Sequence, residues 1–143
     1  MYTNIYEILE DYEIAEDDYE RVDILQRHNL PSLKQWLNYV FNKNIQFHDL
    51  DLKTLEWKRD DSPPGLALNS FSANEHLIYL FIKNHPKASP NLTIQRRREL
   101  LINILESMEA KEADAWLNML KKKPGVKKLT KKIVKQAFPD INI

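Results

Sequence analysis

The chain contains no cysteine, and this absence excludes several kinds of chemistry at once. Without thiols there are no disulfides, no thiolate nucleophiles and no thiolate metal ligands, a composition typical of a reducing compartment. Glycine is almost as scarce, since Gly65 and Gly125 are the only two among 143 residues. Glycines so far apart cannot form a Gly-rich phosphate-binding loop, and their scarcity favours helices over β-sandwiches.

Long apolar runs are missing as well. No stretch reaches the ~18 apolar residues that a membrane-spanning helix requires, and the N-terminal sequence MYTNIYEILEDYEIAEDD is acidic and lacks the apolar core of a signal peptide. We therefore expect a cytoplasmic protein without a membrane partner. Hydrophobic residues make up 43% of the chain and charged residues 29%, which is an ordinary globular composition. We expect residues 1–143 to form a single helical domain.

The apolar residues recur with the spacing of amphipathic helices, and this pattern predicts an all-α fold of about seven helices. The expected helices span residues 5–12, 18–28, 31–41, 72–84, 93–108, 110–122 and 130–137. Ser72 and Glu75 have the spacing of a capping box, and Thr130 is a candidate cap of the last helix. Residues 42–71 mix turn residues with isolated apolar ones, so we expect a connection packed on the core, with a turn at Pro63–Gly65.

Most large apolar side chains on these helices are expected in the core rather than on a binding surface. This group includes the aromatic residues Trp36, Phe41, Phe81 and Trp116, and Tyr19, Val22 and Leu25 of the second helix. Arg97 falls inside the apolar arc of the central helix, so its guanidinium should be paired with an acid or reach solvent along its stem. Arg96 points away from that arc and could reach a phosphate.

Catalytic motifs are missing from the sequence. The histidines are His28, His48, His76 and His85, and no two are three or four residues apart, as a helical metal pair requires. The cluster of His48, Asp49 and Asp51 could supply metal ligands, but a solvated turn is the simpler interpretation. No GxSxG motif presents a serine nucleophile. We therefore expect a non-enzymatic protein with no cofactor and no metal.

The net charge of zero conceals an asymmetry along the chain. Residues 1–30 carry nine acids and two bases, whereas residues 91–143 carry twelve bases and six acids. Such asymmetry indicates a basic surface for an anionic partner. The alternative is that the acidic and basic ends of the chain meet in the fold.

The basic charge is concentrated in residues 121–135, which hold eight lysines: Lys121, Lys122, Lys123, Lys127, Lys128, Lys131, Lys132 and Lys135. On the last helix, the spacing predicts a ridge of four lysines, 128, 131, 132 and 135, opposite the apolar residues Leu129, Ile133, Val134, Ala137 and Phe138. Lysine gives point charges for phosphates without the bidentate geometry by which arginine reads bases. We expect these lysines, together with Arg96, to bind nucleic acid without sequence preference; the alternative is a solvated helix face.

Residues 123–141 read KPGVKKLTKKIVKQAFPDI, a glycine-containing loop followed by a helix that ends in Phe, Pro and Ile. This segment resembles the end of the helical N-terminal DNA-binding domain of ATP-dependent DNA ligases, and similarly ordered elements extend the resemblance over residues 62–141. The resemblance implies contact with the duplex across the minor-groove backbone, here through Lys121–Lys128 and the start of the last helix. The Lys-x-Asp-Gly motif by which ligases accept AMP is absent, so the resemblance implies no catalysis.

Residues 5–10 read IYEILE and residues 130–139 read TKKIVKQAFP. On these residues, the whole chain also resembles a family of small proteins of T4-like phages of marine bacteria. That resemblance implies expression in the host cytoplasm, with association with the virion as an alternative. It supplies no activity.

Two functions therefore remain open. The first is non-specific binding of duplex DNA by the lysines. The second is a protein-interaction module, either a host-takeover factor or a component of the virion or its assembly. In that module Glu7, Glu10 and Asp11 would contact a basic host or phage protein or another copy of the chain. The sequence leaves the oligomeric state open.

Overall fold

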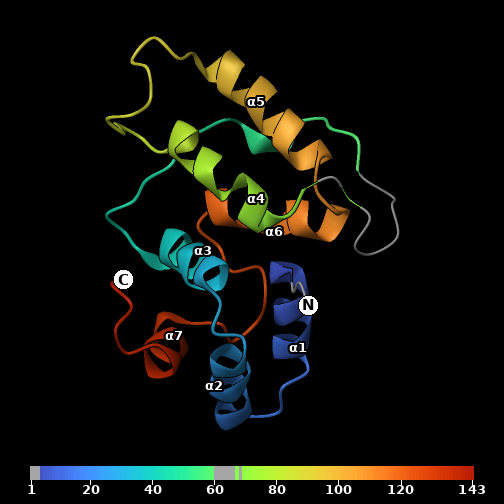
Figure 1. The fold of residues 1–143 in the computed structure, drawn as a ribbon, viewed down its shortest axis with the longest axis vertical. Coiled ribbons are helices and arrows are strands. Elements are labelled where there is room, and N and C mark those ends of the chain that lie inside the picture. The colour runs from blue at the N-terminus through green and yellow to red at the C-terminus, as the bar shows by residue number, and fades with distance from the viewer. Residues whose placement is uncertain (1–3, 60–66, 68) are drawn as a thin grey trace. The chain divides into compact units, whose positions relative to one another are not determined.

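The computed structural model describes residues 4–59, 67 and 69–143, so the predicted turn at Pro63–Gly65 lies outside the described residues. Over the described part, the chain is all-α, with seven α-helices, two short 3-10 helices and no β-strand longer than an isolated bridge (Figure 1). The predicted fold class and the predicted number of helices are confirmed.

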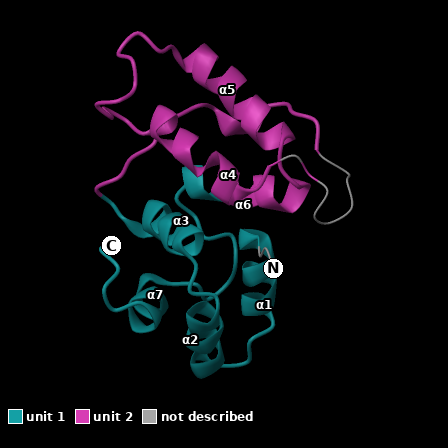
Figure 2. Ribbon diagram, in the orientation of Figure 1, with its two compact units in different colours: residues 1–43, 118–143 teal, residues 44–117 magenta. Residues whose placement is uncertain are grey.

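The chain forms two compact units (Figure 2). Unit 1 consists of residues 1–43 and 118–143 and carries α1 (Ile5–Glu13), α2 (Asp18–Arg27), α3 (Pro31–Phe41) and α7 (Lys131–Ala137). Unit 2 consists of residues 44–117 and carries η1 (Leu52–Thr54), α4 (Phe71–Asn74), η2 (Glu75–Phe81) and α5 (Ile94–Glu106). Helix α6 (Ala110–Leu120) belongs to unit 2 up to residue 117 and to unit 1 beyond it. The number of domains stays a prediction.

Side chains at the helix starts supply acceptors for backbone N–H groups that have no partner within the helix. Asp17 accepts from the Glu20 N–H at 2.9 Å at the start of α2, and Thr130 accepts from the Ile133 N–H at 3.3 Å at the start of α7. The helix predicted from Ser72 begins one residue earlier, because Ser70 is its cap and accepts from the Ala73 N–H at 3.2 Å.

Unit 1 has its own apolar core, to which all four of its complete helices contribute. Helix α2 packs against both α1 and α7. The predicted inner face of the last helix is confirmed, because all five of its apolar residues are buried: Leu129, Ile133, Val134, Ala137 and Phe138. The acidic and basic segments of the chain are therefore joined by a shared core.

Tyr19 does not lie in this core, and the prediction for it is wrong. Its side chain is 90% exposed, because the inner face of α2 passes through Arg21, Ile24 and Leu25 instead. The buried guanidinium of Arg21 is satisfied by Asp18 Oδ1 at 2.6 Å and by the Ala15 carbonyl at 3.4 Å. A paired arginine thus occupies the inward position that the apolar pattern assigns to an aromatic residue.

The core of unit 2 contains the rings of Phe71 and Trp116, whose centroids are 5.4 Å apart and whose planes are tilted by 58°. Arg97 is buried there as expected, but its partners are backbone carbonyls rather than an acid. Its guanidinium donates to the Leu80 carbonyl at 2.8 Å and to the Leu92 carbonyl. Arg97 therefore satisfies one carbonyl in the last turn of η2 and one in the loop before α5.

A candidate nucleic-acid interface

The lysine-rich segment begins at the end of α6 with a Schellman motif. The Lys122 N–H donates to the Met119 carbonyl, and the Lys123 N–H donates to the Asn118 carbonyl, each at 3.0 Å. This motif requires a left-handed residue after the helix, and Lys122 takes that place with φ 57°. Glycine is the usual residue in such a position, so a lysine there indicates that the side chain has its own structural role.

The Lys122 side chain turns inward and caps α3. Its Nζ donates to the carbonyls of Tyr39 and Asn42, each at 2.7 Å, at the helix end where carbonyls have no helical partner. Burial lowers the pKa of Lys122. Because this ammonium is engaged within unit 1, we leave Lys122 out of the interface.

The turn at Gly125 packs tightly against the end of α6. Gly125 has φ 77°, and a Cβ atom built there would lie 2.3 Å from Asn118 Nδ2. Both the left-handed backbone and the close approach require a residue without a side chain at this position. The loop that carries Lys121, Lys123 and Lys127 is therefore fixed at its centre.

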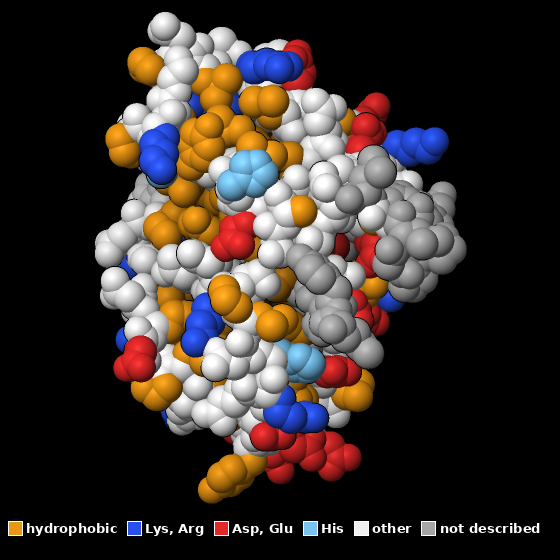
Figure 3. Space-filling model, viewed as in Figure 1, with side chains coloured by type: hydrophobic (Ala, Val, Ile, Leu, Met, Phe, Trp, Pro, Cys, Tyr) orange, Lys and Arg blue, Asp and Glu red, His pale blue; other side chains and the backbone are white. Residues whose placement is uncertain are grey.

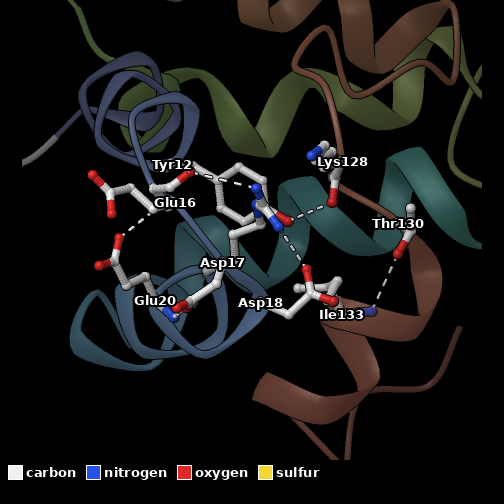
Figure 4. Close-up of polar contacts among 10 residues, drawn as sticks. Tyr12, Glu16, Asp17, Asp18, Glu20, Lys128, Thr130 and Ile133 are labelled. Carbon is white, nitrogen blue, oxygen red and sulfur yellow. Dashed lines mark hydrogen bonds and ion pairs between the residues drawn. The ribbon is translucent and has the colours of Figure 1, made fainter.

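The end of the same loop is fixed by a hydrogen bond to α1. The Tyr12 hydroxyl donates to the Lys128 carbonyl at 2.7 Å (Figure 4). Tyr12 is 1% exposed, and burial raises its pKa to about 12. Lys128 has φ 65° and precedes the Thr130 cap, so it lies before α7 rather than on it. The predicted four-lysine ridge therefore has only three members on the helix.

Six of the eight lysines have exposed side chains: Lys121, Lys123, Lys127, Lys128, Lys132 and Lys135. Lys122 and Lys131 are half-buried. Within the part of the chain that the structure describes, none of the six exposed side chains forms an ion pair with an acid. Six unpaired ammonium groups thus project from one loop and one face of α7.

The start of α2 lies beside these lysines. A pocket of about 520 Å³ is lined by Asp17, Asp18 and Arg21 on one side and by Lys128, Thr130, Lys132 and Ile133 on the other. Residues from the acidic and the basic ends of the chain therefore meet in unit 1, which is the alternative interpretation of the charge asymmetry. Although acidic and basic residues line this one pocket, the six lysine side chains remain exposed.

The other predicted site residues lie on α1 and α5. Arg96 is exposed on α5 in unit 2, where it pairs with Glu99 at 3.0 Å. On α1, the Glu7 carboxylate accepts from the Asn4 N–H at 3.1 Å, and Asp11 Oδ2 lies 3.7 Å from His28 Nε2. Glu10 is exposed on the same helix.

The described residues include no group of three or more histidines and acids that could hold a metal ion. Around His48, the Asp49 carboxylate accepts from the Asp51 N–H at 3.0 Å, and the Asp51 carboxylate accepts from the Thr54 hydroxyl at 2.9 Å, as in a capped turn.

None of the described helices is long and apolar enough to cross a membrane. Compared with known proteins, the chain matches no protein-family model, no curated protein and no solved structure significantly.

Proposed function

We propose that the protein binds duplex nucleic acid without sequence preference through the six exposed lysines of residues 121–135. The observation that carries the proposal is the group of six exposed lysines without an ion pair in the described structure. Non-specific binding to a duplex comes mainly from the release of counterions when cationic side chains neutralise phosphates. Ammonium groups on flexible stems suit that task, since they need no fixed orientation toward the bases.

The backbone that carries these lysines is held at three points, which supports the proposal. Lys122 is fixed to α3, Gly125 to Asn118, and the Lys128 carbonyl to Tyr12. Little backbone entropy is therefore lost on binding, and the cost falls mainly on the lysine side chains.

The acids beside the lysines limit the affinity. Asp17 and Asp18 line the same pocket as Lys128 and Lys132, so their negative charge opposes the approach of phosphates to these two lysines. We expect three to five phosphate contacts and a Kd of about 10⁻⁴–10⁻⁶ M, the usual range for non-specific binding. In this proposal the protein is non-enzymatic, needs no cofactor and acts in the cytoplasm of the phage host, as the two sequence resemblances imply.

Fluorescence anisotropy with two labelled duplexes of unrelated sequence tests the proposal. Both duplexes should bind alike, and the log–log plot of affinity against salt should have a slope of roughly −3 to −4.5, at about 0.9 per phosphate. The variant Lys127→Gln/Lys132→Gln/Lys135→Gln should lose about 2–3 units of that slope.

The matched control is Lys43→Gln/Lys53→Gln/Lys87→Gln, which removes the same charge from exposed positions outside residues 121–135. It should keep nearly the whole slope. Equal loss of slope in the control and in the 127/132/135 variant would mean that only net charge matters. Absence of wild-type binding at low salt would refute the proposal.

A second candidate function, protein interaction, is supported by two exposed apolar side chains in the acidic segment. Ile14 is 78% exposed and Tyr19 is 90% exposed. They lie at the connection between α1 and α2 and in the first turn of α2, rather than at the predicted Glu7, Glu10 and Asp11. A contact at this connection would explain their exposure better than a contact on α1.

A further inference from the structure

Tyr19 borders a pocket between α2 and α7. The pocket has a volume of about 550 Å³ and is lined by Asp18, Tyr19, Val22, Asp23, Gln26 and Gln136. Gln26 Nε2 donates to the Ala137 carbonyl at 3.3 Å and so joins this edge of α2 to α7. An exposed aromatic ring, an apolar neighbour and two carboxylates therefore lie together in one recess, and tyrosine is one of the residue types enriched at protein contacts.

The surroundings of this pocket are strongly acidic. Residues 10–23 hold eight acids and a single base, Arg21, which is buried and bonded to Asp18. Figure 3 shows acidic side chains gathered at the lower end of the view, where Figure 1 places α2 and its connection to α1. An occupant of this surface must therefore bring positive charge as well as an apolar contact for Tyr19.

Such positive charge is present on this chain, directly beside the acidic surface. Residues 121–135 hold eight lysines and no acid. The boundary between the two surfaces is the pocket lined by Asp17 and Asp18 of the acidic segment and by Lys128 and Lys132 of the basic segment. Figure 4 shows the first three of these residues close together. Two adjacent surfaces of opposite sign, similar in charge, thus lie along the neighbouring helices α2 and α7.

Adjacent surfaces of opposite sign are self-complementary under a two-fold rotation. When the axis passes near their boundary, the acidic surface of each copy meets the lysines of the other, and the contact closes at two copies. We propose that the protein pairs with a second copy of itself in this way, through α2 and α7, with Tyr19 as the apolar anchor. The inference does not rest on nucleic-acid binding, but it uses some of the same lysines, so a duplex and the second copy should compete.

Light-scattering mass of the full chain tests the pairing. In about 0.01 M salt, where the Debye length is about 30 Å, the mass should be twice the 17.0 kDa of one chain. In about 1 M salt, where the Debye length falls to about 3 Å, it should shift toward the mass of one chain. The mass of one chain in low salt, or a series of species larger than two chains, overturns the proposal.

Charge reversal tests which surfaces meet. The acid-reversed variant is Glu16→Lys/Asp23→Lys and the lysine-reversed variant is Lys132→Glu/Lys135→Glu, all at exposed positions. Each variant alone should have the mass of one chain, since like charges then face each other, and an equimolar mixture should recover the mass of two. The control Lys53→Glu/Lys87→Glu should leave wild-type pairing unchanged. Failure of the mixture, with wild-type circular dichroism in both variants, overturns the proposal.

Tyr19→Ser separates this pairing from nucleic-acid binding. Because the side chain is 90% exposed, the substitution should leave the helical spectrum intact. The dissociation constant of the pair should rise at least tenfold, while the duplex should bind at least as tightly as it binds the wild type, because the second copy no longer competes for the lysines. Unchanged pairing in Tyr19→Ser refutes the anchor and hence the proposed contact, whatever the result with the duplex.

Discussion

The hydroxyl of Tyr12 donates a 2.7 Å hydrogen bond to the carbonyl of Lys128, 116 residues farther along the chain. The bond joins the first helix to the loop before the last one, so residues from the acidic and basic parts of the sequence share a contact. Lys128 adopts a left-handed backbone at this point, and its carbonyl faces Tyr12 while its side chain remains exposed.

Tyr12→Phe should destabilise the protein by about 1 kcal/mol, because it removes this bond and leaves the Lys128 carbonyl without that partner. Urea unfolding followed by circular dichroism measures the effect. Tyr79→Phe is the control, since the structure gives the Tyr79 hydroxyl no hydrogen bond to any described residue. A Tyr12→Phe variant as stable as that control would show that the bond contributes nothing net.

The same tyrosine should make stability depend on alkaline pH. Its pKa is about 12 in the folded protein against an ordinary value of 10.0, because burial disfavours the phenolate. The folded state therefore holds this proton more tightly, so the associated stability is present below pH 10 and is lost as the pH rises toward 12. The loss should be about 2–3 kcal/mol. Tyr12→Phe has no such proton to lose, so the urea midpoint of the wild type should fall to that of Tyr12→Phe and then below it across this range. Parallel curves would contradict the assignment.

Lys122 combines an unfavourable backbone with favourable side-chain bonds, and two substitutions separate these effects. Lys122→Met keeps the left-handed backbone but removes the ammonium from the Tyr39 and Asn42 carbonyls, at a cost of about 1.5–3 kcal/mol. Lys122→Gly loses the same bonds but relieves the backbone by about 1 kcal/mol. Chemical denaturation should therefore rank the wild type first, glycine second and methionine last. A glycine variant less stable than the methionine variant would argue against the strain.

Gly125→Ala should destabilise the loop through two separable causes. A left-handed residue with a Cβ atom costs about 1–2 kcal/mol, and that Cβ also clashes with the Asn118 amide. The double variant Gly125→Ala/Asn118→Ala removes the clash but not the backbone cost, so it should recover part of the stability in a double-mutant cycle. Simple additivity of the two single effects would show that Asn118 moves aside freely.

Local features of this fold could be predicted from the sequence, because they depend on neighbours along the chain. The helix that starts after Thr130 and the buried face through Ile133 and Val134 follow from residue type and helical spacing. The exposure of Tyr19 could not be predicted, because it depends on Arg21 finding partners at Asp18 and Ala15.

The candidate interface was predictable in composition but not in geometry. The count of lysines is visible in the sequence, whereas the inward turn of Lys122 depends on a left-handed backbone that lysine rarely adopts. The contact between Tyr12 and Lys128 joins residues with no local relation in the chain. Which lysines remain exposed is therefore decided by tertiary contacts.

The two segments of unit 1 are separated in the chain by the whole of unit 2. During synthesis, residues 44–117 leave the ribosome before residues 118–143, so unit 2 can fold while unit 1 still lacks α7. Until that last segment emerges, the apolar faces of α1 and α2 have no partner from it, and the nascent acidic segment has no lysines beside it. Emergence of residues 118–143 should therefore be the step that commits unit 1 to its native structure.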